Sequence, residues 1–226
     1  MMKFKFLPMV VLMVVLLAGC SSTPKSEYFS QRELPDGNTE EVIDTFLRIN
    51  EPPIAEYSDY SGFRYRFLVS GSISQSIICF TLVDSGFGTV FRSRIFYLGG
   101  NKAQCLYDQA RVLTLEEFFA LTSHIEALEK FSLDYMTPEI WSSFATLDGS
   151  SYYLETWYRG ATDTPDVSNV YVAISPETVK YAKNLPQTLK ILFPDEEIDD
   201  IEIVQYLEAF LKFMACIEKL SGIDYY

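Results

Sequence analysis

The chain has a single histidine, His124, which limits the catalytic chemistry available to its side chains. A serine or cysteine nucleophile is usually activated by a neighbouring histidine, so such an apparatus would have to include His124. This residue lies between Leu121 and Leu128, at the border of an apolar helical stripe, which is typical of a half-buried structural histidine. The Ser-x-x-Lys match at residues 22–25 lies in a polar segment that has nothing to hold its geometry. The sequence therefore predicts no catalytic pair of nucleophile and base.

The sequence also offers few residues that could bind a metal or a cofactor. A zinc site takes three or four histidine, cysteine or carboxylate ligands, whereas beyond Cys20 the chain offers one histidine and three scattered cysteines. Acidic residues cluster at positions 195–200 but lack the spacing and the glycine of a calcium-binding loop. Negative charge that favours the start of a helix explains this cluster more simply. With no glycine-rich phosphate loop either, the sequence predicts no metal and no cofactor.

The 31 aspartates and glutamates leave one kind of catalysis open. Glycoside hydrolysis needs two carboxyl groups at a set separation, and so many acids offer many pairs. No spacing in the sequence singles one pair out. A cell-wall or lipid-directed hydrolase with a carboxylate mechanism is therefore kept as an alternative function. A deep pocket that holds two close acids with raised pKa values would favour it.

The N-terminal residues form a pattern that directs export. Two lysines precede an apolar stretch at 6–17, which is shorter than the roughly 20 residues of a membrane-spanning helix. The stretch ends in the sequence Leu-Ala-Gly-Cys at positions 17–20, which resembles the cleavage site of bacterial lipoprotein signals. The resemblance implies that residues 1–19 are a signal peptide and that Cys20 receives the lipid.

The residue after the cysteine and the polar segment behind it refine this expectation. Position 21 is a serine, and in a Gram-negative host the resemblance implies export to the outer membrane, facing the periplasm, rather than retention in the inner membrane. Residues 20–37 are rich in small and polar side chains and are expected to form a lipidated tether. Several acyl chains anchor a protein stably, so the membrane is an expected partner through the lipid alone.

Residues 38–226 are expected to form a single domain. The chain of 226 residues is 48% hydrophobic and 15% aromatic, which excludes a disordered protein. Its formal net charge of −13 becomes more negative when the signal peptide and its two lysines are removed. Nucleic acids and anionic lipids attract basic surfaces, so the charge argues against nucleic acid as a partner and against electrostatic binding to a membrane.

Hydrophobic periodicity predicts the fold class. Apolar and polar side chains alternate over residues 63–69, which indicates a half-buried strand. A capping box begins at Thr114, Asn38 is expected to cap an earlier helix, and Pro52-Pro53 is expected to end it. We expect strands at 63–69, 76–83, 89–98, 104–112, 151–159 and 170–174, and helices from Asn38, Leu115, Pro176 and Ile201. These runs predict an α+β fold, an antiparallel meander sheet with helices packed on one face.

Three cysteines remain beyond Cys20. Cys79 and Cys105 fall in strands that a simple hairpin order places two strands apart, which is too far for a disulfide unless the order differs. Cys216 falls in an apolar helical pattern and is interpreted as a small buried hydrophobic residue. The sequence leaves the disulfide state open.

Short motifs along residues 52–222 resemble, in their order, a group of bacterial secreted and lipid-anchored proteins that has no assigned activity. The motifs are Tyr65-Arg66-Phe67, Leu113-Thr114-x-Glu116-Glu117, Leu147-Asp148-Gly149-Ser150-Ser151-Tyr152-Tyr153-Leu154-Glu155, Tyr171 with Ser175-Pro176, and Leu220-Ser221-Gly222. The chain departs from the group at Tyr153 and Ile174, where those proteins favour tryptophan. The resemblance implies the fold and transfers no function.

Aromatic residues near a long loop suggest how the protein works. Trp157 and Tyr158 precede a loop at 160–166 that contains Asp163 and Asp166. Loops on a rigid scaffold often carry recognition, and aromatic side chains often anchor protein interfaces. We therefore expect these four residues to bind protein. The chain is predicted to be a non-catalytic protein-binding module of the envelope, for which an immunity or inhibitor protein against a toxin is one form.

Overall fold

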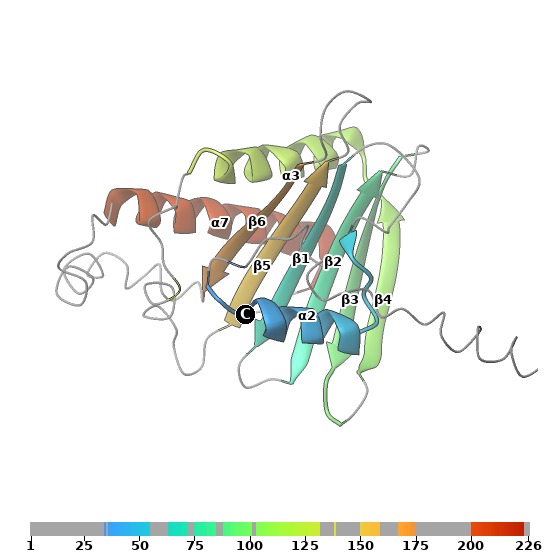
Figure 1. Cartoon of the computed structure of the whole chain (residues 1–226). Coiled ribbons are helices and arrows are strands. Elements are labelled where there is room, and N and C mark those ends of the chain that lie inside the picture. The colour runs from blue at the N-terminus through green and yellow to red at the C-terminus, as the bar shows by residue number, and fades with distance from the viewer. Residues whose placement is uncertain are drawn as a thin grey trace, which may run out of the picture.

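A computed structural model describes residues 34, 36–54, 63–71, 75–84, 88–100, 103–131, 138, 150–158, 167–174 and 200–223. Six antiparallel strands form one sheet in the order β4-β3-β2-β1-β5-β6 (Figure 1). The strands are β1 Phe63–Gly71, β2 Ser76–Asp84, β3 Thr89–Tyr97, β4 Gln104–Val112, β5 Ser150–Tyr158 and β6 Val167–Ile174. Strands β1 to β4 form a meander, and β5 returns to pair with the other side of β1.

Helices cover both faces of this sheet. Helices α3 (Leu115–Leu128) and α7 (Asp200–Ser221) pack together on one face, and α2 (Thr39–Arg48) crosses the other (Figure 1). The predicted α+β class and antiparallel meander are confirmed. The expectation of helices on one face holds for α3 and α7 but omits α2. The reason is that the central strands carry apolar side chains toward both faces, with Phe67 on one and Leu68 on the other.

The core beneath α3 and α7 is built from aromatic rings. Phe67, Phe80 and Phe91 lie on neighbouring strands with stacked rings, their centroids 6.0 and 5.9 Å apart. Phe213 of α7 meets Phe67 edge-on at 5.0 Å. Aromatic pairs of this kind add about 0.5–1.5 kcal/mol beyond the burial of their area. This face of the sheet is therefore held firmly to α7.

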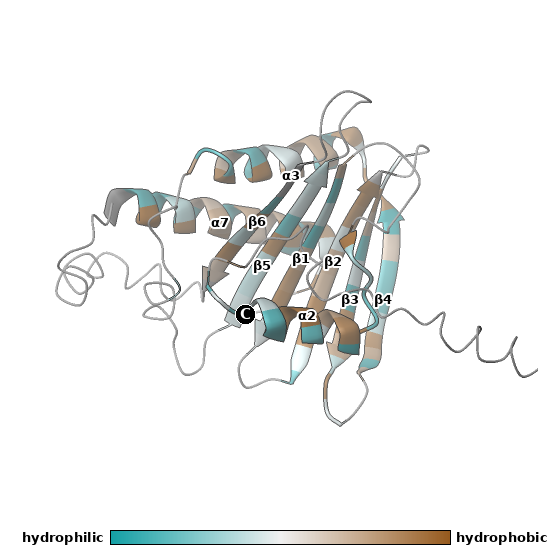
Figure 2. Cartoon of the chain, in the orientation of Figure 1, coloured by the Kyte–Doolittle hydropathy of each residue, from teal (hydrophilic) through white to brown (hydrophobic). Residues whose placement is uncertain are grey.

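A second core lies beneath α2. The buried side chains of this helix are Val42, Ile43 and Phe46, and they pack on the apolar part of the sheet around Leu68. Figure 2 shows hydrophobic residues in the part of β1 and β2 that lies behind α2. Leu34 is buried in the same core, although the sequence assigns it to the tether. The packed chain therefore begins before the predicted start of the domain.

The two ends of α2 differ from the sequence prediction. Asn38 occupies the N-cap position, but its side chain makes no capping hydrogen bond and its amide donates to Asp36 Oδ2 at 3.0 Å. At the other end Asn50 has a φ of 54°, and the N–H of Glu51 donates to the carbonyl of Phe46 at 2.8 Å. This is a Schellman arrangement. The helix thus ends before the predicted proline pair, and the turn directs Glu51 toward the sheet.

A capping box fixes the junction between β4 and α3, as predicted. Thr114 Oγ1 accepts a hydrogen bond from the N–H of Glu117 at 3.2 Å, and Glu117 Oε2 accepts one from the N–H of Thr114 at 2.9 Å. Arg111 donates to both carboxylate oxygens of Glu117 at 2.9 Å. It also donates to the carbonyl of Leu220 at 3.1 Å. One arginine therefore joins β4, the start of α3 and the end of α7.

The three described cysteines are free. Cys79 lies on β2 and Cys105 on β4, two strands apart as predicted, and Cys216 is half-buried beside the core. Within the described ranges, no helix is long and apolar enough to cross a membrane. The predicted signal peptide, Cys20, most of the tether and the helix from Pro176 lie outside the described residues.

Substitution of Glu117 by glutamine should weaken the acid sensitivity of folding. Hydrogen bonds from Arg111, and next from the N–H of Thr114, lower the pKa of Glu117 to about 2. A carboxyl group whose pKa is lower in the folded state stabilises the fold above its unfolded pKa of about 4.3. That contribution is lost as the pH falls through the folded pKa. Urea unfolding between about pH 5 and pH 2 should therefore show a smaller loss of stability for Glu117→Gln than for the unchanged chain.

A matched control lies in the same turn of α3. Glu116→Gln removes the same charge and leaves the contacts of Glu117 with Arg111 and Thr114 in place. This variant should keep the acid sensitivity of the unchanged chain. Identical pH dependence of the two variants would contradict the role given to Glu117.

Candidate binding surface and a buried charge network

Four of the eight arginines in the chain gather on the sheet face that α2 crosses. Arg64 and Arg66 lie on β1, and Arg92 and Arg94 lie on β3. The alternating sequence of β1 predicts one exposed face, yet Arg64 and Arg66 are only 2% and 1% exposed. The prediction of a half-buried strand is wrong here, because residues 51–54 leave α2 and cover these two side chains.

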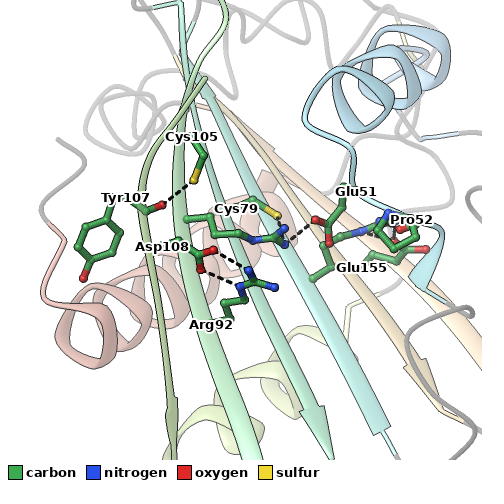
Figure 3. A network of polar contacts seen from close by, with 10 residues as sticks. Glu51, Pro52, Cys79, Arg92, Cys105, Tyr107, Asp108 and Glu155 are labelled. Carbon is green, nitrogen blue, oxygen red and sulfur yellow. Dashed lines mark hydrogen bonds and ion pairs between the residues drawn. The ribbon is translucent and has the colours of Figure 1, made fainter. Parts of the chain in front are cut away.

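Arg66 contacts groups from three other parts of the chain. Its Nε and Nη2 both donate to Glu155 Oε2 on β5, and the bond from Nε is 3.0 Å long. Its Nη1 donates to the carbonyl of Pro52 at 2.7 Å. Its guanidinium carbon lies 3.8 Å from the centroid of the Phe46 ring in α2. Figure 3 shows Glu155 and Glu51 on the same side of the sheet, close to Pro52.

Two more buried arginines, Arg94 and Arg64, make contacts on either side of those made by Arg66. Arg94 pairs with Glu51 at 2.5 Å, and its Nη2 donates to Cys79 Sγ at 3.8 Å. Arg64 donates to the carbonyl of Ile54 at 3.2 Å. Together with Arg66, they attach the segment that follows α2 to the sheet. We call Arg64, Arg66 and Arg94, with Glu51 and Glu155, the buried charge network. Figure 3 labels its two glutamates.

Burial governs the electrostatics of this network. It raises the pKa of Glu51 and of Glu155, although the nearby arginines oppose the shift, and the charge of Glu51 raises the pKa of Glu155 further. Burial also raises the pKa of the Cys79 thiol to about 12, so this cysteine is a poor nucleophile. Glu155 Oε1 accepts no hydrogen bond from the described residues. The network thus holds two close acids with raised pKa values, each paired with an arginine.

The described cavities lie away from these two acids. A cavity of about 370 Å³ lies between α2 and the turn end of β1 and β2, and its lining includes Glu41 and Asp44. Glu51 and Glu155 line neither this cavity nor two much smaller ones. Within the described residues, the buried charge network joins β1, β3 and β5 to the segment that follows α2.

His124 is half-buried on α3, as the sequence predicts. Burial lowers its pKa, and the positive charge of Lys212 lowers it further. In the part of the chain that the structure describes, no three histidine, cysteine or acidic side chains converge as metal ligands.

Two of the four residues predicted to bind protein are described. Trp157 is buried beneath Arg64, whose guanidinium carbon lies 4.3 Å from the ring centroid. Its prediction as a contact residue is therefore wrong, because side chains alternate along β5 and this one faces the covered α2 side. Tyr158 faces the opposite way and is 54% exposed. Asp163 and Asp166 lie outside the described residues.

Tyr158 belongs to a row of apolar side chains that continues onto α3. It lies opposite Phe63 in the β1–β5 ladder. The ring of Phe63 stacks on Phe118 of α3 at 4.8 Å, and Phe118 contacts Phe119 at 5.6 Å between centroids. Phe119 is 62% exposed, and Leu115, one turn earlier, is more exposed still. We call these five residues the aromatic strip.

The sequence analysis did not predict the α3 part of the aromatic strip. The helical stripe through Phe118, Leu121 and Ile125 accounts for the core-facing side of α3, and Phe119 falls just outside it. Leu115 and Phe119 are four residues apart, so they share a second face of the helix. Two large apolar side chains at this spacing, outside the core stripe, were the signal that could have revealed them.

Acidic side chains lie near Tyr65, which neighbours the aromatic strip. Tyr65 lies beside Phe63, with ring centroids 5.4 Å apart. Burial raises the pKa of Tyr65 to about 12, and the negative charges of Glu129 and Glu126 on α3 add to this shift. Both glutamates are exposed. The surface near Tyr65 therefore carries negative charge, like the chain as a whole.

No protein family, no curated protein and no solved structure matches the chain. The α+β class consequently rests on the structure alone. The resemblance carried by the short sequence motifs stays a prediction.

Removal of one partner from the buried charge network should be costly. Glu155→Leu leaves the Arg66 guanidinium buried without its carboxylate, and loss of one partner of a buried ion pair costs about 3–5 kcal/mol. Replacement of both partners, as Arg66→Met with Glu155→Leu, should recover most of this loss because neither charge of this pair is then left buried without its partner. Urea unfolding of the single and double variants measures the difference.

An exposed ion pair on the same face provides the control. Arg92 donates to both carboxylate oxygens of Asp108 at 2.7 and 2.6 Å, and both side chains are about 40% exposed. Exposed pairs contribute only about 0–1 kcal/mol, so Arg92→Met should have a small effect. A loss for Glu155→Leu no larger than that for Arg92→Met would show that the buried network is not what attaches α2.

Proposed function

We propose that the chain is a lipid-anchored protein of the bacterial envelope that works by binding another protein, without turnover of a substrate. The aromatic strip is the observation that carries the binding function. The Leu-Ala-Gly-Cys sequence at positions 17–20 supports the anchor and a location at the outer membrane, facing the periplasm.

The aromatic strip has the properties of an interface anchor. Tyr158, Phe119 and Leu115 are exposed, while Phe63 and Phe118 beneath them are half-buried and stacked. A rigid base reduces the side-chain entropy that binding removes. Binding energy in protein interfaces concentrates in a few such anchors, which polar residues surround.

Charge indicates the chemistry of the partner. Glu126 and Glu129 lie near Tyr65, whose ring stacks on Phe63 of the strip, and the chain carries a formal net charge of −13. Complementary charge speeds association and rejects partners of like charge. A protein with an apolar patch surrounded by basic residues therefore fits best, and a basic toxin or enzyme that arrives in the periplasm meets this description. An immunity or inhibitor protein is the form of binding module that we favour.

One observation keeps the alternative hydrolase testable. Glu41 and Asp44 line the cavity of about 370 Å³ beside α2, and both are exposed. Hydrolysis of peptidoglycan or phospholipid by the pure protein, abolished by Glu41→Gln or Asp44→Asn, would overturn the binding function in favour of a carboxylate mechanism.

Tyr158→Ala and Phe119→Ala should each weaken partner binding by roughly 1–3 kcal/mol without unfolding the protein. The full chain in detergent would be immobilised and exposed to envelope extract, and captured proteins would be identified by mass spectrometry. The affinity of the purified partner for each variant would then be measured by titration.

The control for this experiment is an exposed apolar residue on the opposite face. Leu47 of α2 is 49% exposed, and Leu47→Ala should leave the affinity unchanged. Equal losses at Leu47 and at the strip would indicate nonspecific adhesion. An unchanged affinity for both strip variants would contradict the proposed surface.

Cys20 should be the lipidated N-terminus of the mature protein. Mass spectrometry of the protein purified from membranes should show an acylated peptide that begins at Cys20. Cys20→Ser should shift the protein from the detergent phase to the aqueous phase, because stable anchoring requires the acyl chains. Cys105→Ser, which removes another exposed cysteine, should leave the partition unchanged. A mature N-terminus at any other residue would contradict the proposed anchor.

A further inference from the structure

Strand β4 forms one edge of the sheet and is exposed along its length. Its only described neighbour is β3, and of its nine residues only Tyr107 is half-buried while the others are exposed. An edge strand presents a row of N–H and C=O groups that another strand can pair with. Large apolar side chains add to this, since Leu106 and Val112 are 58% and 60% exposed.

The residues of β4 are arranged symmetrically about Gln109. Leu106 and Val112 each lie three residues from it, Tyr107 and Arg111 two residues, and Asp108 and Ala110 one residue. Two copies of β4 can pair in antiparallel orientation with Gln109 opposite Gln109. Leu106 of one copy then faces Val112 of the other, Tyr107 faces Arg111, and Asp108 faces Ala110. Apolar side chains then meet each other, and an aromatic ring meets a guanidinium.

We propose that two copies of this chain pair through β4 in this antiparallel register, so that the two sheets become one continuous sheet. The contact lies on a different element from the aromatic strip of β1, β5 and α3. The inference therefore goes beyond the proposed function and does not depend on it.

The choice of register follows from charge and from a bulge. A centre at Asp108 would place two carboxylates opposite each other, which destabilises a strand pair, whereas the centre at Gln109 places Asp108 opposite Ala110. The register of β3 with β4 shifts between Ile95 and Phe96, which leaves Leu106 as the extra residue. The regular part of β4 therefore begins at Tyr107. The pairs Tyr107–Arg111 and Asp108–Ala110 lie within it, whereas Leu106 of the outermost pair is the bulged residue.

Net charge sets the conditions for this association. Each copy carries a formal charge of −13, so two copies repel each other at long range. Salt screens such repulsion, and the pairing should therefore strengthen as the ionic strength rises. A strand pair held mainly by surface ion pairs would show the opposite dependence.

Disulfide trapping of the full chain in detergent tests the register. In a Cys105→Ser background, which removes the exposed native thiol of β4, Gln109→Cys places two thiols opposite each other. Opposed residues of an antiparallel pair have Cα atoms about 4.5–5.5 Å apart, which lies within the range of about 4.4–6.8 Å for a disulfide. A covalent dimer should form at least about tenfold faster than with Gln104→Cys, whose counterpart lies about 34 Å away at roughly 3.4 Å per residue.

Sedimentation completes the test in the absence of any added cysteine. The unchanged chain should sediment as a dimer in detergent, and Leu106→Asp with Val112→Asp should weaken the dimer at least about tenfold, while circular dichroism shows the fold retained. A chain that stays monomeric at every concentration overturns the proposal. Equal cross-linking at positions 109 and 104, or a dimer that the double aspartate variant leaves intact, overturns it as well.

Discussion

The contacts of Arg66 determine how the α2 side of the sheet is built. A buried guanidinium must find acceptors within the protein, because an uncompensated buried charge costs several kcal/mol. Arg66 finds them in Glu155 on the neighbouring strand and in the carbonyl of Pro52. The Schellman turn after α2 brings this carbonyl and Glu51 to the sheet. The position of α2 therefore follows from the arginine as much as from the apolar side chains of the helix.

This arrangement also decides what remains at the surface. One sheet face is covered by α3 and α7, and the other is closed by α2 and by residues 51–54. The large exposed apolar side chains are then found at the start of α3, at the ends of β3 and β5, along β4 and on α2 at Leu47. Because the acids of the buried charge network face arginines, the surface, and not the interior, is where we place the function. A buried ion pair contributes little net stability over apolar residues of similar size, so we assign this one a role in fixing where α2 docks.

Local patterns predicted much of the fold. The alternation in β1 and the Thr114 capping box predict a strand of the meander and the start of α3, because each depends on neighbouring residues only. Sequence could not reveal that Arg64 and Arg66 are buried, since the residues that cover them lie 10 and 14 positions away in the chain. It also could not reveal that Arg64 covers Trp157. The same limit applies to the site. Tyr158, which the sequence predicted to bind protein, is exposed, whereas the continuation of the strip onto Phe119 depends on how α3 packs against β1.

Site-specific photo-crosslinking in living cells would decide whether the aromatic strip binds another protein. A benzophenone side chain at position 119 would be compared with the same group at position 47, which is exposed on the opposite face. We expect a covalent adduct with one envelope protein from position 119 and none from position 47. Absence of an adduct at position 119, or equal adducts from both positions, would contradict the binding function.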